Sequence, residues 1–157
     1  MRPQGACSQR NVPPGSGRLM MVPDSGPGNC MRIVGLGLDA TEVPRIAEML
    51  ERYGDRFRQR VYTRGEIAYC DARGRGAAAS YAARFAAKEA GMKAIGTGHT
   101  RGVIWRDLEV VRHGGPPQLQ FHGAAARHLA ALGATRALLT LTHTADLAIA
   151  HVILVAD

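Results

Sequence analysis

The sequence predicts a single α+β domain, and three observations lead to that class. Segments with helical periodicity cluster in the middle of the chain, and segments with strand character lie at both ends. A length of 157 residues suits one hydrophobic core and not two. No internal repeat is visible.

The first half of the patterned region begins with a strand and continues into helices. The expected elements are a strand over 32–39, a helix over 41–52, a short helical piece over 56–61, a helix from 63 to 72 and a long Ala-rich helix over 78–95. Thr41 is the expected N-cap of the first helix, Pro44 is tolerated in its first turn, and Gly54 interrupts it. Thr63 and Glu66 have the spacing of a capping box, which opens a further helix.

The second half returns to strands. The expected elements are a strand over 103–112, a turn over 113–117, a strand over 118–122, a helix over 124–132 and strands over 138–143 and 148–155. Gly133 is expected to end the helix, and a short turn joins the last two strands.

The chain is strongly basic, with a formal net charge of +7. Arginine outnumbers lysine 18 to 2, and Lys88 and Lys93 fall in one short segment. Arg codons of a GC-rich genome explain this bias, and so does a site that needs a compact ammonium. Cys7, Cys30 and Cys70 are too scattered for a disulfide framework or a metal site.

Residues 1–30 show no period and are interrupted throughout by Pro, Gly and Ser. We interpret them as a disordered tail or a mis-assigned start, with one domain over 31–157. No apolar run approaches the roughly 20 residues of a membrane helix, and no stretch resembles a secretory signal. We therefore expect a cytoplasmic protein with no membrane contact.

Asp39 ends a glycine-rich strand, RIVGLGLD (32–39). Alternation puts the aliphatic residues 34, 36 and 38 on one face and the glycines 35 and 37 with Asp39 on the other. We expect the aliphatic face to be the core. The glycine face is then bare backbone, which a ligand or another backbone approaches closely. The alternative is that Asp39 only caps the next helix.

The segment RFAAKEAGMK (84–93) concentrates charge on one helix. Glu89 shares its face with small and apolar side chains and with Lys93. Such a carboxylate needs a partner, which is either Lys93 at i+4 or a metal ion. Arg84 and Lys88 form a second cationic pair one turn apart. The pattern fits a phosphate site with a metal between, although a solvated helix face would also give it.

Two further motifs are weaker when taken alone. Gly96 and Gly98 can bring backbone N–H groups to an anion, or they can form a helix C-cap. His143 ends a strand with hydroxyls on both sides, where a histidine can shuttle protons or hold a phosphate. A lone histidine is more often a half-exposed surface residue.

Taken together and in this order, these motifs resemble the holo-acyl-carrier-protein synthases, the short trimeric type of 4′-phosphopantetheinyl transferase. The matching segments are IVGLGLDATEVPRI (33–46), RFRQRVYTRGE (56–66), RFAAKEAGMKAIGTG (84–98), WRDLEVV (105–111) and LTHTADLAIAHVIL (141–154). The third is highly specific. Thr142 stands where the family often has Ser, and Gly115-Pro116-Pro117 replaces a common Gly-Lys-Pro turn.

The resemblance implies an antiparallel sheet packed with the long Ala-rich helix, in a homotrimer with active sites at the subunit interfaces. It implies transfer of 4′-phosphopantetheine from coenzyme A to a serine of apo-acyl carrier protein, which releases adenosine 3′,5′-bisphosphate and supports fatty acid biosynthesis. Asp39 and Glu89 would bind Mg²⁺, and Glu89 would share in deprotonating the serine. A neighbouring subunit would lend part of the coenzyme A pocket.

The resemblance also suggests substrate contacts. The coenzyme A candidates are Lys93 and His143, followed by Arg84, Lys88, Gly96 and Gly98. Acyl carrier proteins are acidic, and Arg45 and Arg52 lie seven residues apart on one helix face, with Arg56 beyond. We expect these arginines to dock the carrier by charge. A generic solvated basic face is the alternative.

Rival function classes share some of these features. A small nucleic-acid-binding protein fits the charge, but aromatic residues make up only 5% and no stacking motif occurs, so we expect no nucleic-acid partner. Another magnesium-dependent phosphotransferase would use the same carboxylates without an acidic protein partner. The intact Asp39, Glu89 and His143 argue against a non-catalytic trimeric scaffold.

Overall fold

The computed structural model describes residues 31–157, so the predicted tail over 1–30 lies outside the described residues. The elements are β1 (Arg32–Glu42), α1 (Val43–Val61), α2 (Arg64–Asp71), the 3₁₀ turn η1 (Gly74–Gly76), α3 (Ala77–Ala94), the 3₁₀ turn η2 (Trp105–Asp107), β2 (Leu108–Val111), β3 (Gln118–Phe121), α4 (Gly123–Ala131), β4 (Arg136–His143) and β5 (Leu147–Ala156). Three helices follow the first strand and the longest strands lie at the two ends, which confirms the α+β class.

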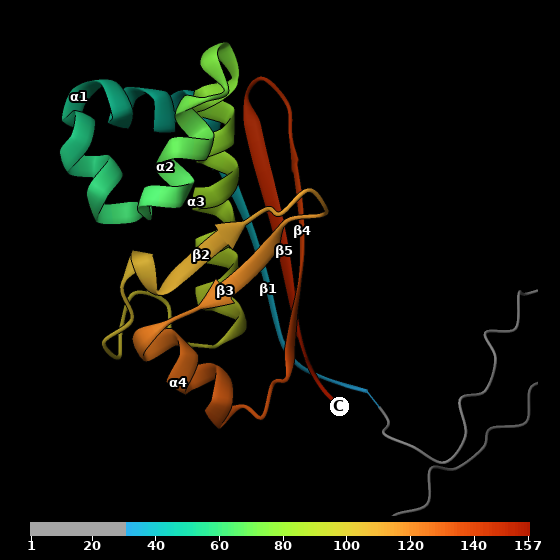
Figure 1. Cartoon of the computed structure of the whole chain (residues 1–157). Coiled ribbons are helices and arrows are strands. Elements are labelled where there is room, and N and C mark those ends of the chain that lie inside the picture. The colour runs from blue at the N-terminus through green and yellow to red at the C-terminus, as the bar shows by residue number, and fades with distance from the viewer. Residues whose placement is uncertain (1–30) are drawn as a thin grey trace, which may run out of the picture.

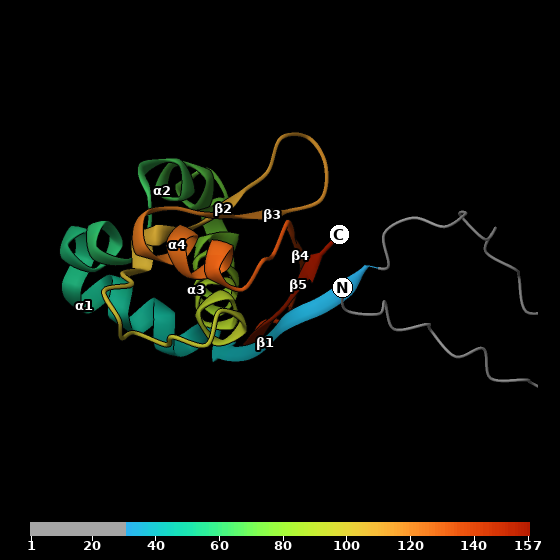
Figure 2. The same cartoon turned by 90° about the horizontal axis from the view of Figure 1, so that it is seen from below.

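The elements form layers around α3 (Figures 1 and 2). Strands β1, β5 and β4 make an antiparallel sheet in that order, and β2 pairs with β3 in a separate hairpin. One side of α3 packs on β1 and β5, while α1, α2 and β2 contact it elsewhere. Among the described elements, no helix covers the outer face of the sheet (Figure 2). No helix within residues 31–157 has both the length and the hydropathy of a membrane span.

The glycine face of β1 packs directly on α3. A Cβ on Gly37 would collide with the carbonyl of Ala90, and one on Gly35 would collide with that of Ala94. The expectation that the aliphatic face is the core is therefore wrong. Leu36 and Leu38 point outward and are 60% and 58% exposed, because only bare backbone fits against the helix.

The start of α1 also differs from the prediction. Strand β1 continues to Glu42, the N-cap position, and no side chain caps the helix. Thr41 is thus not the N-cap; it stays in the strand and donates a hydrogen bond to Asp39. The break at Gly54 is confirmed by its non-helical backbone, with φ 50°. The capping box that opens α2 is confirmed as well.

A buried ion pair connects α2, α3 and β2. Lys88 Nζ lies 2.8 Å from Glu66 Oε2, and both side chains are 0% exposed. Lys88 also donates to the carbonyls of Trp105 (3.2 Å) and Leu108, while Glu66 Oε1 accepts from the backbone N of Val110 (3.0 Å). Burial lowers the pKa of Lys88, and the nearby Glu66 carboxylate opposes that shift.

The strand expected over 103–112 is shorter in the structure. Residues Trp105–Asp107 form η2, and pairing begins only at Leu108. Two sets of interactions explain the turn. The carboxylate of Asp107 accepts from the backbone N of Ile104, and Lys88 donates to the carbonyl of Trp105, the first residue of the turn, and to that of Leu108, the residue after it.

Removing the buried ammonium should destabilise the fold strongly. Lys88→Met keeps most of the volume but leaves the Glu66 carboxylate buried without its counter-charge. We expect the free energy of unfolding, measured by urea denaturation, to fall by about 3–5 kcal/mol. Lys93→Met, whose ammonium is half exposed, should cost about 0–1 kcal/mol. Equal losses in the two variants would contradict a structural role specific to Lys88.

Candidate active site

Asp39 is held in a fixed orientation beside α3. Its Oδ1 lies 2.9 Å from Lys93 Nζ, and its Oδ2 accepts from the Thr41 hydroxyl at 2.9 Å. Lys93 also donates to the Leu38 carbonyl at 3.1 Å. The side chain of Asp39 remains 15% exposed, so a ligand can reach it. No hydrogen bond from this side chain caps α1, which excludes the capping interpretation.

Glu89 lies one turn before Lys93 on α3. Its Oε1 is 2.8 Å from His99 Nε2, and its side chain is 23% exposed. The ion pair between Glu89 and Lys93 is not formed, because the Lys93 ammonium turns to Asp39 instead. Each of the two carboxylates therefore has its own nitrogen partner.

The packing of β1 on α3 brings the two carboxylates to the same part of the helix. Gly35 meets the carbonyl of Ala94, and Gly37 meets that of Ala90. Two strand residues advance by about 6.7 Å, and four helix residues by about 6 Å. Asp39 therefore reaches the next turn toward the N-terminus of α3, residues 86–89, which ends with Glu89.

The donor set at this position suits a hard divalent cation. Carboxylate oxygens are the ligands that Mg²⁺ prefers, and the ion usually keeps several waters or substrate phosphate oxygens. Within residues 31–157 no group of three or more His, Cys, Asp or Glu side chains converges. Asp39 and Glu89 thus fit a cation shared with an anionic substrate, rather than one enclosed by protein.

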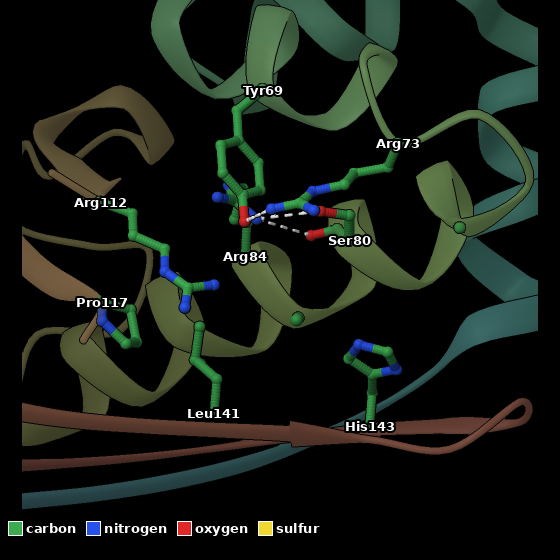
Figure 3. A pocket seen from close by; sticks show the side chains of 10 residues that line it. Tyr69, Arg73, Ser80, Arg84, Arg112, Pro117, Leu141 and His143 are labelled. Carbon is green, nitrogen blue, oxygen red and sulfur yellow. Dashed lines mark hydrogen bonds between the residues drawn. The ribbon is translucent and has the colours of Figure 1, made fainter. Parts of the chain in front are cut away.

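A cationic cavity of about 510 Å³ lies beside α3, between α2 and β4 (Figure 3). Its polar lining comes from Tyr69, Arg73, Ser80, Arg84, Arg112 and His143. Figure 3 shows His143 rising from β4 toward the helices, and Arg112 entering from the end of β2. Polar side chains from four separate parts of the chain, three of them carrying arginines, therefore meet in one cavity.

Two arginines of this cavity pack against the ring of Tyr69. The Arg84 guanidinium lies 4.0 Å from the centre of the Tyr69 ring, and that of Arg73 lies 4.3 Å away. Burial raises the pKa of Tyr69, but the nearby guanidinium groups of Arg112 and Arg73 outweigh it and lower that pKa. Arg84 is buried, and its Nε has no partner in the described chain. Such clustered, incompletely paired guanidinium groups suit a phosphate.

Three of the predicted coenzyme A candidates have protein partners in the structure. Lys88 is enclosed in the core by its pair with Glu66. Gly96 and Gly98 have φ values of 72° and 55°, and their backbone N–H groups donate to the carbonyls of Lys93 and Met92. Their N–H groups are thus used in a helix C-cap, the alternative that the sequence left open.

The remaining predicted residues fall into separate groups. Asp39, Glu89 and Lys93 gather where β1 meets α3, whereas Arg84 and His143 line the cavity, and none of the first three lines it. Arg45, Arg52 and Arg56 are all exposed on α1. One chain therefore does not bring Lys93 and His143 to the same place.

Several site residues escaped the sequence prediction. Tyr69 and Arg73 carry a detectable signal, since their i, i+4 spacing places them on one face of α2 and its end. Arg112 and His99 carry no comparable signal. Their positions depend on how the segments after α3 fold back against it.

Known proteins resemble this chain in both sequence and structure. Residues 35–150 match the model of the 4′-phosphopantetheinyl transferase superfamily. A holo-[acyl-carrier-protein] synthase of Solibacter usitatus is 56% identical over 123 residues, which cover 78% of this chain and 98% of that protein. One of Koribacter versatilis is 54% identical with the same coverage.

Solved structures agree with these relatives. The holo-[acyl-carrier-protein] synthase of Neisseria meningitidis has a TM-score of 0.71 and 30% identity, covering 78% of this chain and 98% of its own. A holo-(acyl-carrier-protein) synthase of Bacillus anthracis in complex with CoA (3′,5′-ADP) has a TM-score of 0.66 and 32% identity, covering 82% and 100%. This chain therefore belongs to the holo-[acyl-carrier-protein] synthase family of the 4′-phosphopantetheinyl transferase superfamily.

Proposed function

We propose that this chain transfers 4′-phosphopantetheine from coenzyme A to a serine of apo-acyl carrier protein. The products are holo-acyl carrier protein and adenosine 3′,5′-bisphosphate. The observation that carries the proposal is the pair of oriented, solvent-accessible carboxylates at the contact of β1 with α3. The relatives at 56% and 54% identity carry the corresponding name.

The residues of this site have separable tasks in the transfer. Asp39 and Glu89 would hold Mg²⁺, which when bound offsets negative charge on the diphosphate of coenzyme A. The half-exposed ammonium of Lys93, fixed by Asp39, can hold a phosphate oxygen through its remaining N–H. Glu89 Oε2 makes no hydrogen bond within residues 31–157, so this oxygen is available to a ligand, and the Glu89 carboxylate would share in taking the serine proton.

The transfer forms one phosphorus–oxygen bond and breaks another. The serine Oγ attacks the phosphorus that carries the pantetheine arm, and the serine proton goes to the Glu89 carboxylate. The bond from that phosphorus to the bridging oxygen breaks, and adenosine 3′,5′-bisphosphate leaves with the electron pair. Lys93 lies beside the carboxylates, where charge develops on the diphosphate.

We also propose that the active form is a homotrimer. The outer face of the sheet exposes Leu36 and Leu138, which lie on either side of Ile153 across three paired strands. A contiguous exposed apolar face is typical of a protein contact. The cationic cavity and the carboxylates occupy different faces of α3, so a neighbouring copy in a closed ring can bring its cavity to the carboxylates of the first.

The acidic carrier would dock on α1. Arg45, Arg52 and Arg56 are exposed, and none of them forms an ion pair with an acidic side chain of the described residues. Unpaired surface arginines attract an acidic partner over several ångströms and align it before contact. This proposal distinguishes the chain from a phosphotransferase without a protein acceptor.

The first prediction tests the reaction and its carboxylates. With apo-carrier, coenzyme A and Mg²⁺, the wild-type chain should add the mass of phosphopantetheine to the carrier. Glu89→Gln and Asp39→Asn should each lower turnover by about 10²–10³-fold, through weaker stabilisation of the transition state. Excess Mg²⁺ should recover part of the loss in Asp39→Asn. Mass spectrometry of the carrier measures both effects.

The control for these variants is Asp157→Asn, which alters a carboxylate at the far end of β5 and should leave turnover unchanged. A folded Glu89→Gln variant with near-full turnover would refute the proposed role of Glu89. A wild-type enzyme that is indifferent to chelator would refute the cation.

The second prediction tests the shared site by mixing two inactive variants. Glu89→Gln lacks the carboxylate, and Arg73→Ala with His143→Ala lacks two polar side chains of the cavity. If each site combines the carboxylates of one subunit with the cavity of the next, randomly mixed trimers should regain about a quarter of the wild-type activity. Light scattering should give three times the monomer mass. A monomer, or a mixture no more active than its parts, would overturn the shared site.

The third prediction tests carrier docking. Arg45→Glu with Arg52→Glu should raise the KM for the carrier about 10–100-fold, because the favourable charge is reversed. The KM for coenzyme A should stay within about twofold of wild type. The matched control is Arg127→Glu, an exposed arginine on α4. Docking on α1 would be wrong if both KM values rose together or if the control behaved alike.

A further inference from the structure

His99 holds one oxygen of the proposed cation ligand Glu89. The distance from His99 Nε2 to Glu89 Oε1 is 2.8 Å. An ionised carboxylate can only accept, so Nε2 carries the hydrogen and donates it. The other oxygen, Oε2, stays free of hydrogen bonds within the described chain. The bond therefore leaves one oxygen of Glu89 for a ligand.

An aromatic stack fixes the ring of His99. Its centre lies 4.0 Å from that of Trp105, which in turn lies 4.5 Å from Phe85. Phe85 is on α3, one turn before Glu89, and His99 lies in the loop after α3, so the three rings connect that loop to the helix. Contact with Trp105 restricts the rotamers of His99 and so favours its hydrogen bond with Glu89.

The stack is in turn attached to the core. The carbonyl of Trp105 accepts from Lys88 Nζ at 3.2 Å, and Lys88 is held by the buried carboxylate of Glu66. The position of Trp105 therefore depends on an ion pair that water does not reach. A rigid support for His99 extends from the core to the site.

We propose that His99 is a positioning residue that pre-orients Glu89 for the divalent cation. Glu89 is partly exposed and has several rotatable bonds, so without His99 it would lose rotamer freedom only when the cation binds. Hydrogen bonds of this kind to a metal ligand commonly change cation affinity by about 10–100-fold. The inference rests on the proposed function, in which Glu89 holds Mg²⁺.

The test measures cation binding without turnover. Mg²⁺ is titrated into the full chain with coenzyme A and no carrier, and binding is followed by calorimetry. Trp105, the only tryptophan of the chain, gives an independent fluorescence signal from within the stack. His99→Ala should weaken Mg²⁺ binding about 10–100-fold. His99→Gln keeps an N–H donor and should restore most of the affinity.

The same variants are then compared in the transfer assay. Half-saturating Mg²⁺ should rise in His99→Ala by the factor found in binding, while kcat at saturating Mg²⁺ stays within about threefold. A variant that is merely misfolded would lose kcat without moving the Mg²⁺ dependence. Circular dichroism checks the fold, and His99→Phe, which keeps a ring beside Trp105 but has no N–H donor, replaces His99→Ala if that variant is unstable.

The matched control is His122→Ala. His122 pairs with Glu109 at 3.1 Å and is 47% exposed, against 41% for His99, but it lies outside the site. The positioning role is overturned if His99→Ala binds Mg²⁺ within about twofold of wild type, or if His122→Ala weakens binding equally. If the Mg²⁺ shift appears but wild type leaves the carrier unmodified, the positioning role stands and the proposed function fails.

Discussion

The contact between β1 and α3 is the constraint on which the rest of this structure depends. It has no space for a Cβ at Gly35 or Gly37, so the backbone of the strand lies against the backbone of the helix. This closeness places Asp39 within reach of the Lys93 ammonium and level with the turn of Glu89. A side chain at either glycine would push the strand away and separate the two carboxylates. The two glycines therefore affect the proposed site only by setting the distance between β1 and α3.

The same contact explains the exposed face of the sheet. Since β1 presents its glycines to α3, its leucines must point away, and β5 and β4 add Ile153 and Leu138 in register. A single chain thus exposes apolar side chains on the strands that carry its site residues. Close packing of β1 on α3 and an exposed apolar sheet face are two results of one strand pattern.

Local rules predicted much of the fold from the sequence. The break at Gly54 follows from its backbone freedom, and the capping box of Thr63 and Glu66 follows from spacing. The wrong predictions concern the ends of two elements, the face of β1 that meets the core and the burial of Lys88. Alternation along a strand defines two faces, but it does not say which one meets the core when the small face can approach a helix more closely. The burial of Lys88 depends on its ion pair with Glu66, and no local sequence pattern predicts that these two residues are partners.

The two lysines of this arginine-rich chain illustrate how the site and the core share one helix. Lys88 directs three donors from a single atom to the Glu66 carboxylate and to two carbonyls, which a planar guanidinium would not match. Lys93 uses two donors on Asp39 and the carbonyl of Leu38. Both positions thus use a compact ammonium, one enclosed in the core and one beside Asp39 at the surface. Through the carbonyl of Trp105, the buried lysine also supports the stack that holds His99 against Glu89.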